Sequence, residues 1–149
     1  MSAPQIFVDA NVLIAAAASD RGGSRFLLEL SADHKVDLFT VRYALEEAAR
    51  NVKNKLSQDV LTTYEKLLLD GAPAIVSLGG VKLSMHRVVS ALVPHKDIPI
   101  LLGAFASRCP YFVTLDQVDF LKNEKLTILP LPFAMLTPGD FLQKHYRKL

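Results

Sequence analysis

Short apolar segments alternate with longer segments of helix-forming composition along this 149-residue chain, and this alternation most limits the folds open to it. The apolar segments lack the strict polar and apolar alternation of a sheet that has one face in water. Such strands are typical of a parallel sheet covered by helices on both faces, so we predict an α/β fold. The expected strands span residues 5–9, 36–41, 74–78, 111–115 and 126–129.

The segments between these strands carry residues that begin or end helices. Ser24 is expected to cap a helix that ends near His34, and Pro99 suits the first turn of a helix that begins at Ile98. No repeat or linker interrupts the pattern, so we expect a single domain over residues 1–149. The expected helices span residues 10–19, 25–34, 42–56, 57–69, 81–93, 98–107 and 139–148.

The charge, the cysteine content and the apolar runs limit where in the cell the protein is expected and which partners it could bind. The chain has 17 basic and 15 acidic residues, so a phosphate partner would depend on local arrangement and not on bulk charge. The single Cys109 cannot form an internal disulfide. The apolar run over residues 6–18 contains Asp9 and Asn11 and is shorter than the roughly 20 residues of a membrane span. We therefore expect a cytoplasmic protein without a membrane partner.

Acidic residues stand where ligands bind in folds of this class, beyond the carboxyl ends of the strands. Asp9 ends the first strand, Asp116 follows the fourth, and Asp97 opens the helix that leads into the fourth strand. Carboxylates brought together repel one another unless a cation compensates them, and oxygen ligands suit Mg²⁺ or Mn²⁺. Zinc would favour histidine or cysteine, and the four histidines lack metal-ligand spacing.

Each of these acids also has a purely structural interpretation. Asp9 and Asp97 could cap the helices that follow them, and Asp116 could open an Asx-turn. Capping and metal ligation are compatible, so both interpretations stay open.

These segments resemble a known family. The run Val8-Asp-Ala-Asn-Val-Leu-Ile14 resembles the opening strand and helix of PIN-domain nucleases, the group that includes the VapC toxins of toxin–antitoxin pairs. The segments 96–101 and 111–116 resemble its second half, and the likeness extends over residues 5–129. It implies a three-layer α/β/α PIN-like fold with a central, mainly parallel sheet, and an Mg²⁺- or Mn²⁺-dependent endoribonuclease with four catalytic acids.

The resemblance assigns Asp9, Asp97 and Asp116 to the first, third and fourth of these acids, which also bind the metal. The second belongs on the helix over residues 42–56, where Glu47 is favoured because family members usually place this acid two residues after an apolar position. Glu46 stays open, since both residues lie at a similar angle from the apolar stripe of that helix.

Three further residues match less closely. Asn11 and Thr114 stand where the family carries small polar residues that orient the acids, and Asp119 could approach the metal on a helical turn after Asp116. Cys109, Met85 and His86 are interpreted as packing or surface residues.

The partners follow from the same resemblance. We expect an RNA substrate, a homodimer and, if the protein is a toxin, an antitoxin on a separate polypeptide. The alternative is a PIN-fold protein without catalysis that binds RNA or another protein. Basic residues that could contact the RNA backbone are Arg42, Arg50, Lys53, Lys55, Lys144, Arg147 and Lys148.

Overall fold

A parallel five-stranded sheet forms the centre of the molecule, in the strand order β3-β2-β1-β4-β5. The computed structural model describes residues 2–146. The first strand lies in the middle of the sheet, so the carboxyl ends of β2, β1 and β4 lie side by side at one edge. The strands are β1 (Gln5–Val8), β2 (Asp37–Thr40), β3 (Ala74–Ile75), β4 (Tyr111–Val113) and β5 (Ala134–Leu136).

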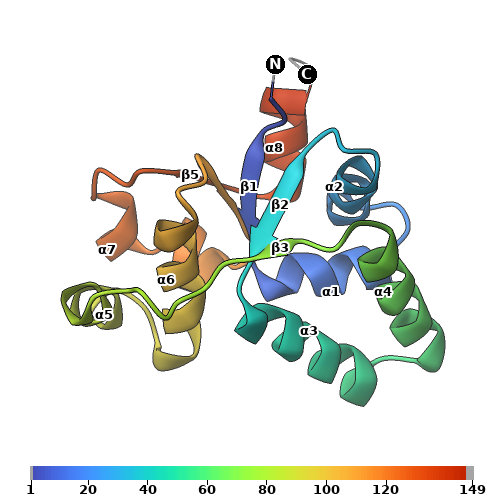
Figure 1. Cartoon of the computed structure of the whole chain (residues 1–149), viewed down its shortest axis with the longest axis horizontal. Coiled ribbons are helices and arrows are strands. Elements are labelled where there is room, and N and C mark those ends of the chain that lie inside the picture. Colours follow the sequence, from blue (N-terminus) through green and yellow to red (C-terminus); the bar gives the residue numbers. More distant parts are fainter. Residues whose placement is uncertain (1, 147–149) are drawn as a thin grey trace.

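Helices cover both faces of this sheet, which confirms the predicted three-layer α/β architecture (Figure 1). One group of helices packs around α1, and α8 joins it through α2. On the other side, α5 packs on α6, and α6 packs on β1 and β2. The first group is α1 (Ala10–Ala18), α2 (Gly23–Ala32), α3 (Arg42–Lys55), α4 (Gln58–Gly71) and α8 (Pro138–His145); the second is α5 (Leu83–Ser90), α6 (Ile98–Ser107) and α7 (Glu124–Thr127).

The central strands are apolar because both of their faces are buried. Ile6, Phe7 and Val8 have no exposed surface, and Phe7 packs edge-to-face on Phe112 of β4 with 5.6 Å between ring centroids. Helix α6 approaches the sheet closely at Gly103, where a Cβ atom would lie 2.6 Å from the Phe7 ring. A glycine is required there by this contact.

Several local predictions were wrong. Residues 126–129 do not form a strand: Asn123 accepts a hydrogen bond from the N–H of Lys125 and begins the short helix α7, and the last strand lies at Ala134–Leu136. Ser24 does not cap α2, because the helix begins at Gly23 with Gly22 as its N-cap residue. Ser24 is therefore a helical residue, and it is buried. Helix α5 and strand β3 are also shorter than predicted.

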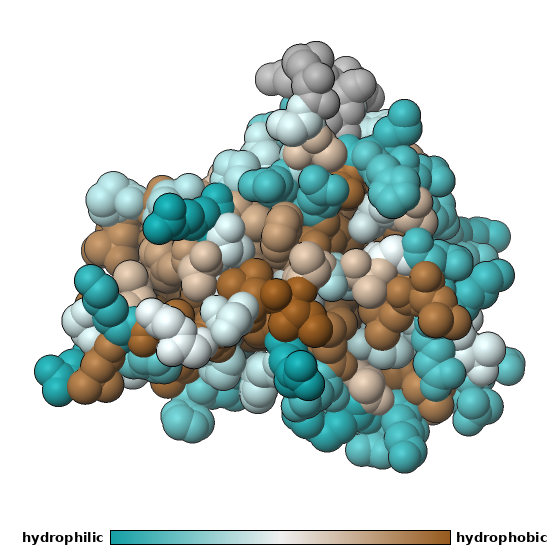
Figure 2. All heavy atoms as spheres, viewed as in Figure 1, coloured by the Kyte–Doolittle hydropathy of each residue, from teal (hydrophilic) through white to brown (hydrophobic). Residues whose placement is uncertain are grey.

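Some hydrophobic residues lie at the surface, while the residues interpreted as packing or surface residues are at least half-buried. Figure 2 shows hydrophobic residues gathered along the middle of one face, over β3, whose Ile75 is 53% exposed. Cys109 is buried, and burial raises the pKa of its thiol. Met85 and His86 are half-buried on α5. Within residues 2–146, the helices are too short or too polar to cross a membrane.

Candidate metal centre

Three carboxylates meet at the carboxyl edge of the sheet. Asp97, Asp116 and Asp119 each offer an oxygen atom, and these oxygens lie within 4.8 Å of one another. Asp97 ends the 3₁₀ turn η1 (His95–Asp97) before α6, Asp116 follows β4, and Asp119 lies in the π-helical turn η2 (Gln117–Leu121). The helical turn on which Asp119 was expected to approach the metal is therefore present.

Asp9 lies beside this group with its carboxylate already hydrogen-bonded. The N–H of Ala10 donates to Oδ1 (2.7 Å), while the Thr114 hydroxyl (2.8 Å) and the Asn11 amide (3.3 Å) donate to Oδ2. Burial raises the pKa of Asp9 to about 6, against the opposing effect of the Thr114 and Ala10 hydrogen bonds. Asp9 thus caps α1, as its structural interpretation predicted, and keeps a second oxygen directed toward β4.

Thr114 connects the two strand ends. Its buried hydroxyl donates to Asp9 and accepts from the N–H of Asp116 at 3.1 Å. Asn11 adds a second link, since its Oδ1 accepts the N–H of Leu115 at 3.1 Å. These contacts fix Asp9 and the backbone of Asp116 relative to each other, which is the arrangement expected if Asn11 and Thr114 orient the acids.

Asp97 is the least satisfied acid of the group. It stands at the N-cap position of α6, yet within the described residues its side chain makes no capping hydrogen bond and its buried Oδ2 has no partner. Burial and the neighbouring Asp119 carboxyl raise the pKa of Asp97 to about 7. A buried carboxylate oxygen without a partner is costly, and a cation would satisfy it.

Asp116 and Asp119 are held by their own turn and by a lysine. The N–H of Asp119 donates to Oδ1 of Asp116 (2.9 Å), so Asp116 is the N-cap of η2 and does not form the expected Asx-turn, which would bond the N–H two residues on. The ammonium group of Lys96 lies 3.6 Å from Oδ2 of Asp119, although Lys96 is 67% exposed. Sequence reasoning did not single out Lys96, and its position next to Asp97 was the only signal.

The all-oxygen donor set and the orphaned Oδ2 of Asp97 together fit a hard divalent cation such as Mg²⁺ or Mn²⁺. The residues that could hold it are Asp97, Asp116 and Asp119, with Asp9 adjacent.

Helix α3 brings one of its two candidate acids toward this site. Glu47 is half-buried, and its charge contributes to the raised pKa of Asp9 after the larger effect of burial. Glu46 is exposed. The geometry therefore favours Glu47 as the residue that faces the other acids. Tyr43, one turn earlier on α3, faces the same region: its pKa is raised mainly by burial and then by the charge of Glu47.

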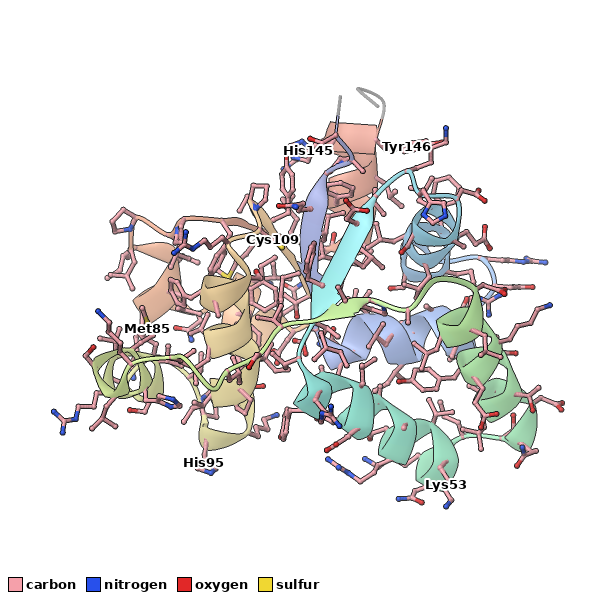
Figure 3. All side chains as sticks on the ribbon, in the orientation of Figure 1. Lys53, Met85, His95, Cys109, His145 and Tyr146 are labelled. Atoms are coloured by element: carbon pink, nitrogen blue, oxygen red, sulfur yellow. The ribbon has the colours of Figure 1, made fainter. Side chains whose placement is uncertain are left out.

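Lys144, near the end of the described chain, does not lie near the acids. Lys144 precedes His145, whose Nδ1 lies 3.4 Å from the hydroxyl of Tyr111, the first residue of β4. This contact places the end of α8 at the amino edge of the sheet, and Figure 3 shows His145 at the opposite end of the molecule from His95. The prediction that Lys144 lies near the site is therefore wrong. Arg147 and Lys148 lie outside the described residues.

Comparison with known proteins bears on the fold. No family model matches the sequence, and no curated protein matches it. Among solved structures, the chain is similar to one from the crystal structure of VapBC2 from Rickettsia felis bound to a DNA fragment from their promoter. The TM-score is 0.61 at 16% sequence identity, over 82% of this chain and 95% of the other. The resemblance to PIN-domain nucleases is therefore confirmed at the level of the fold, and the chain has a PIN-like three-layer α/β/α fold.

Proposed function

We propose that this protein is an Mg²⁺- or Mn²⁺-dependent endoribonuclease that hydrolyses RNA phosphodiester bonds, and that it is the toxin of a toxin–antitoxin pair. The observation that carries this proposal is the buried, unpartnered Oδ2 of Asp97 beside two further carboxylates. Such a group of acids attracts a cation, and a cation held by carboxylates is a place for a phosphate.

The catalytic residues of the proposal are Asp9, Glu47, Asp97 and Asp116, with Asp119 as a further metal ligand. When bound, the cation supplies Lewis-acid chemistry: it neutralises charge on the scissile phosphate and lowers the pKa of an attacking water. Thr114 and Asn11 hold Asp9 in place, and Glu47 accepts a proton from the water. The water oxygen bonds to phosphorus, the P–O3′ bond breaks, and the departing O3′ takes a proton from solvent water, which leaves a 3′-hydroxyl and a 5′-phosphate.

The toxin assignment is supported by the fold likeness, because the similar chain belongs to a VapBC2 assembly. By analogy we propose an antitoxin on a separate polypeptide and a homodimeric protein in the cell interior. A short neighbouring reading frame with a DNA-binding pattern would support the toxin role. A PIN-fold module without catalysis is disfavoured, because a carboxylate occupies every acid position of the proposed quartet.

A cleavage assay tests the enzymatic part of this proposal. The purified protein is expected to cleave single-stranded RNA with Mg²⁺ or Mn²⁺ and to lose this activity in EDTA. Asp9→Asn and Asp116→Asn are expected to lower cleavage by at least about 100-fold while circular dichroism shows an intact fold. Asp59→Asn, an exposed acid in the first turn of α4, is the matched control and should cleave normally. Cleavage that persists in both site variants would overturn the proposal, and a wild-type protein that binds no Mn²⁺ would favour the inactive module.

A further inference from the structure

We propose that a groove next to the metal centre receives the RNA strand beside the bond that is cleaved, an inference that rests on the proposed function. We call it the lysine groove. It has a volume of about 620 Å³, within the roughly 300–1,000 Å³ range of ligand pockets. One wall is the end of α5 and the segment that follows it, residues 90–94, and the other wall consists of Val118 and residues 122–125.

The lysine groove and the metal centre are built from the same elements. Val118 lies in η2 directly before Asp119, and Pro94 is the N-cap of the turn that contains Lys96 and Asp97. The Asn123 amide donates to the carbonyl of Leu92 and to the carbonyl of Asp119, both at 2.9 Å. Asn123 therefore ties the two walls together and fixes the backbone of one proposed ligand. The groove thus adjoins the segment that carries Asp119.

The charge of the groove suits a phosphate backbone. Lys122 and Lys125 are exposed on one wall, against the single acid Glu124. Lys96, also exposed, follows the groove residue Pro94 by two positions and pairs with Asp119. Lysine side chains supply the contacts that position a nucleic-acid backbone without reading its sequence.

The lysine groove also has exposed apolar side chains on both of its walls. Val118 is 80% exposed although it is a large apolar residue, and Leu92 and Pro94 line the facing wall. Among the described residues that line it, the groove has no aromatic side chain for base stacking, but its apolar side chains can contact the faces of unstacked bases, whereas the bases of a stable duplex are stacked on one another. The combination of lysines and exposed apolar side chains therefore favours single-stranded RNA as the occupant.

The test measures binding separately from cleavage. A fluorescein-labelled single-stranded RNA of mixed sequence is titrated in EDTA, so that it stays intact, and anisotropy is recorded over a range of salt concentrations. The double variant Lys122→Ala/Lys125→Ala is expected to bind about 10-fold more weakly at low salt. The slope of log K against log salt should fall by about 1.4, since each phosphate contact to a single strand contributes about 0.7.

The control variant Lys35→Ala/Lys66→Ala removes the same charge from exposed positions outside the groove and should keep the wild-type slope. An unchanged slope in the groove variant would overturn the inference. An equal fall in both variants would also overturn it, because binding would then depend on total charge.

A second pair of variants tests the apolar wall. Val118→Glu places a negative charge in the groove, whereas Ile128→Glu makes the same kind of change at a residue that is equally 80% exposed and does not line it. We expect RNA binding to weaken about 10-fold in Val118→Glu alone, with both variants folded. Equal binding by the two variants would contradict the inference.

These arms separate the two proposals. A wild-type protein that cleaves RNA while the groove variants behave like their controls leaves the proposed function intact and removes the groove from it. A wild-type protein that neither binds nor cleaves RNA removes both. Weaker binding in the groove variants of a protein that cannot cleave would support the groove alone.

Discussion

At the scale of single residues, Asp97 stands out because, within residues 2–146, its Oδ2 is the one buried side-chain oxygen or nitrogen atom without a hydrogen-bond partner. The pKa of this carboxyl is raised to about 7. Sequence reasoning could place Asp97 at the start of a helix, where a cap is the ordinary interpretation. It could not show that the side chain turns away from the helix N-terminus toward two other acids, because that direction depends on tertiary packing.

The raised pKa of Asp97 predicts a pH-dependent effect of its removal. Between about pH 4 and pH 7 the folded, metal-free protein holds a proton on this carboxyl that the unfolded chain has released, so the carboxyl lowers the free energy of unfolding as the pH rises through this window. We expect the advantage of Asp97→Asn over the wild type in EDTA to be small near pH 4. Above pH 7 it should reach about 1–2 kcal/mol, a value reduced for solvent screening.

Urea unfolding at a series of pH values checks this expectation. Excess Mn²⁺ at pH 8 should reverse the order, because a cation that binds only the folded state stabilises the protein that keeps the ligand. A difference between the two proteins that stays constant over the pH range would contradict the assignment.

Removal of the Lys96 charge is predicted to strengthen cation binding. Its ammonium group lies 3.6 Å from Asp119 and competes with a cation for the same negative charge. Lys96→Met keeps the aliphatic stem and removes the charge, so we expect Mn²⁺ to bind about 3- to 10-fold more tightly at low ionic strength, with a smaller gain in high salt.

Isothermal titration with Mn²⁺ measures this, with Lys35→Met as a distant control. Weaker Mn²⁺ binding in Lys96→Met would mean instead that Lys96 holds Asp119 in position.

At the scale of elements, the apolar pattern and the residues that begin or end helices predicted the longer helices well and the short ones poorly. Helix α6 begins and ends where the sequence predicts, because Pro99 fits its first turn and residues 100–104 form a continuous buried apolar run. The segment 126–129 was predicted as a strand from its apolar residues, yet only Leu126 is buried and Ile128 is 80% exposed. A single helical turn contributes too little pattern to be separated from a short strand.

The packing of α6 on the sheet predicts a costly substitution. In Gly103→Ala the new Cβ would lie 2.5 Å from the Val41 side chain and 2.6 Å from the Phe7 ring, so these buried side chains or the helix itself must shift. We expect the free energy of unfolding to fall by about 1–3 kcal/mol, as for other overpacked cores.

Gly80→Ala is the matched control, since nothing lies within 4 Å of its Cβ position and its stability should change by less than about 0.5 kcal/mol. Urea denaturation of both variants provides the measurement. Equal stability of the two would show that α6 adapts without cost.

At the scale of the whole molecule, the alternation of apolar and helical segments was enough to predict a covered parallel sheet with acids at its carboxyl edge. The order of the strands was not available from the sequence. It places β1 between β2 and β4, and so brings Asp9 next to Thr114 and Asp116. The ion pair of Lys96 and the two contacts of Asn123 depend on the same packing, because each joins segments whose approach is set by the sheet.

The net charge of +2 does not show that acidic and basic side chains are separated in space. Acids gather at one edge of the sheet, and lysines line the groove beside it.

The burial of Cys109 makes it practical to follow nucleic-acid binding in solution with a label on another residue. This thiol, 2% exposed and with a raised pKa, should react slowly with maleimides, and the chain contains no other cysteine. A cysteine introduced by Val118→Cys would therefore take up a fluorophore or a cross-linker selectively without removal of the native residue. Such a label, placed beside the acids, would report the arrival of a nucleic-acid strand by a change in its emission.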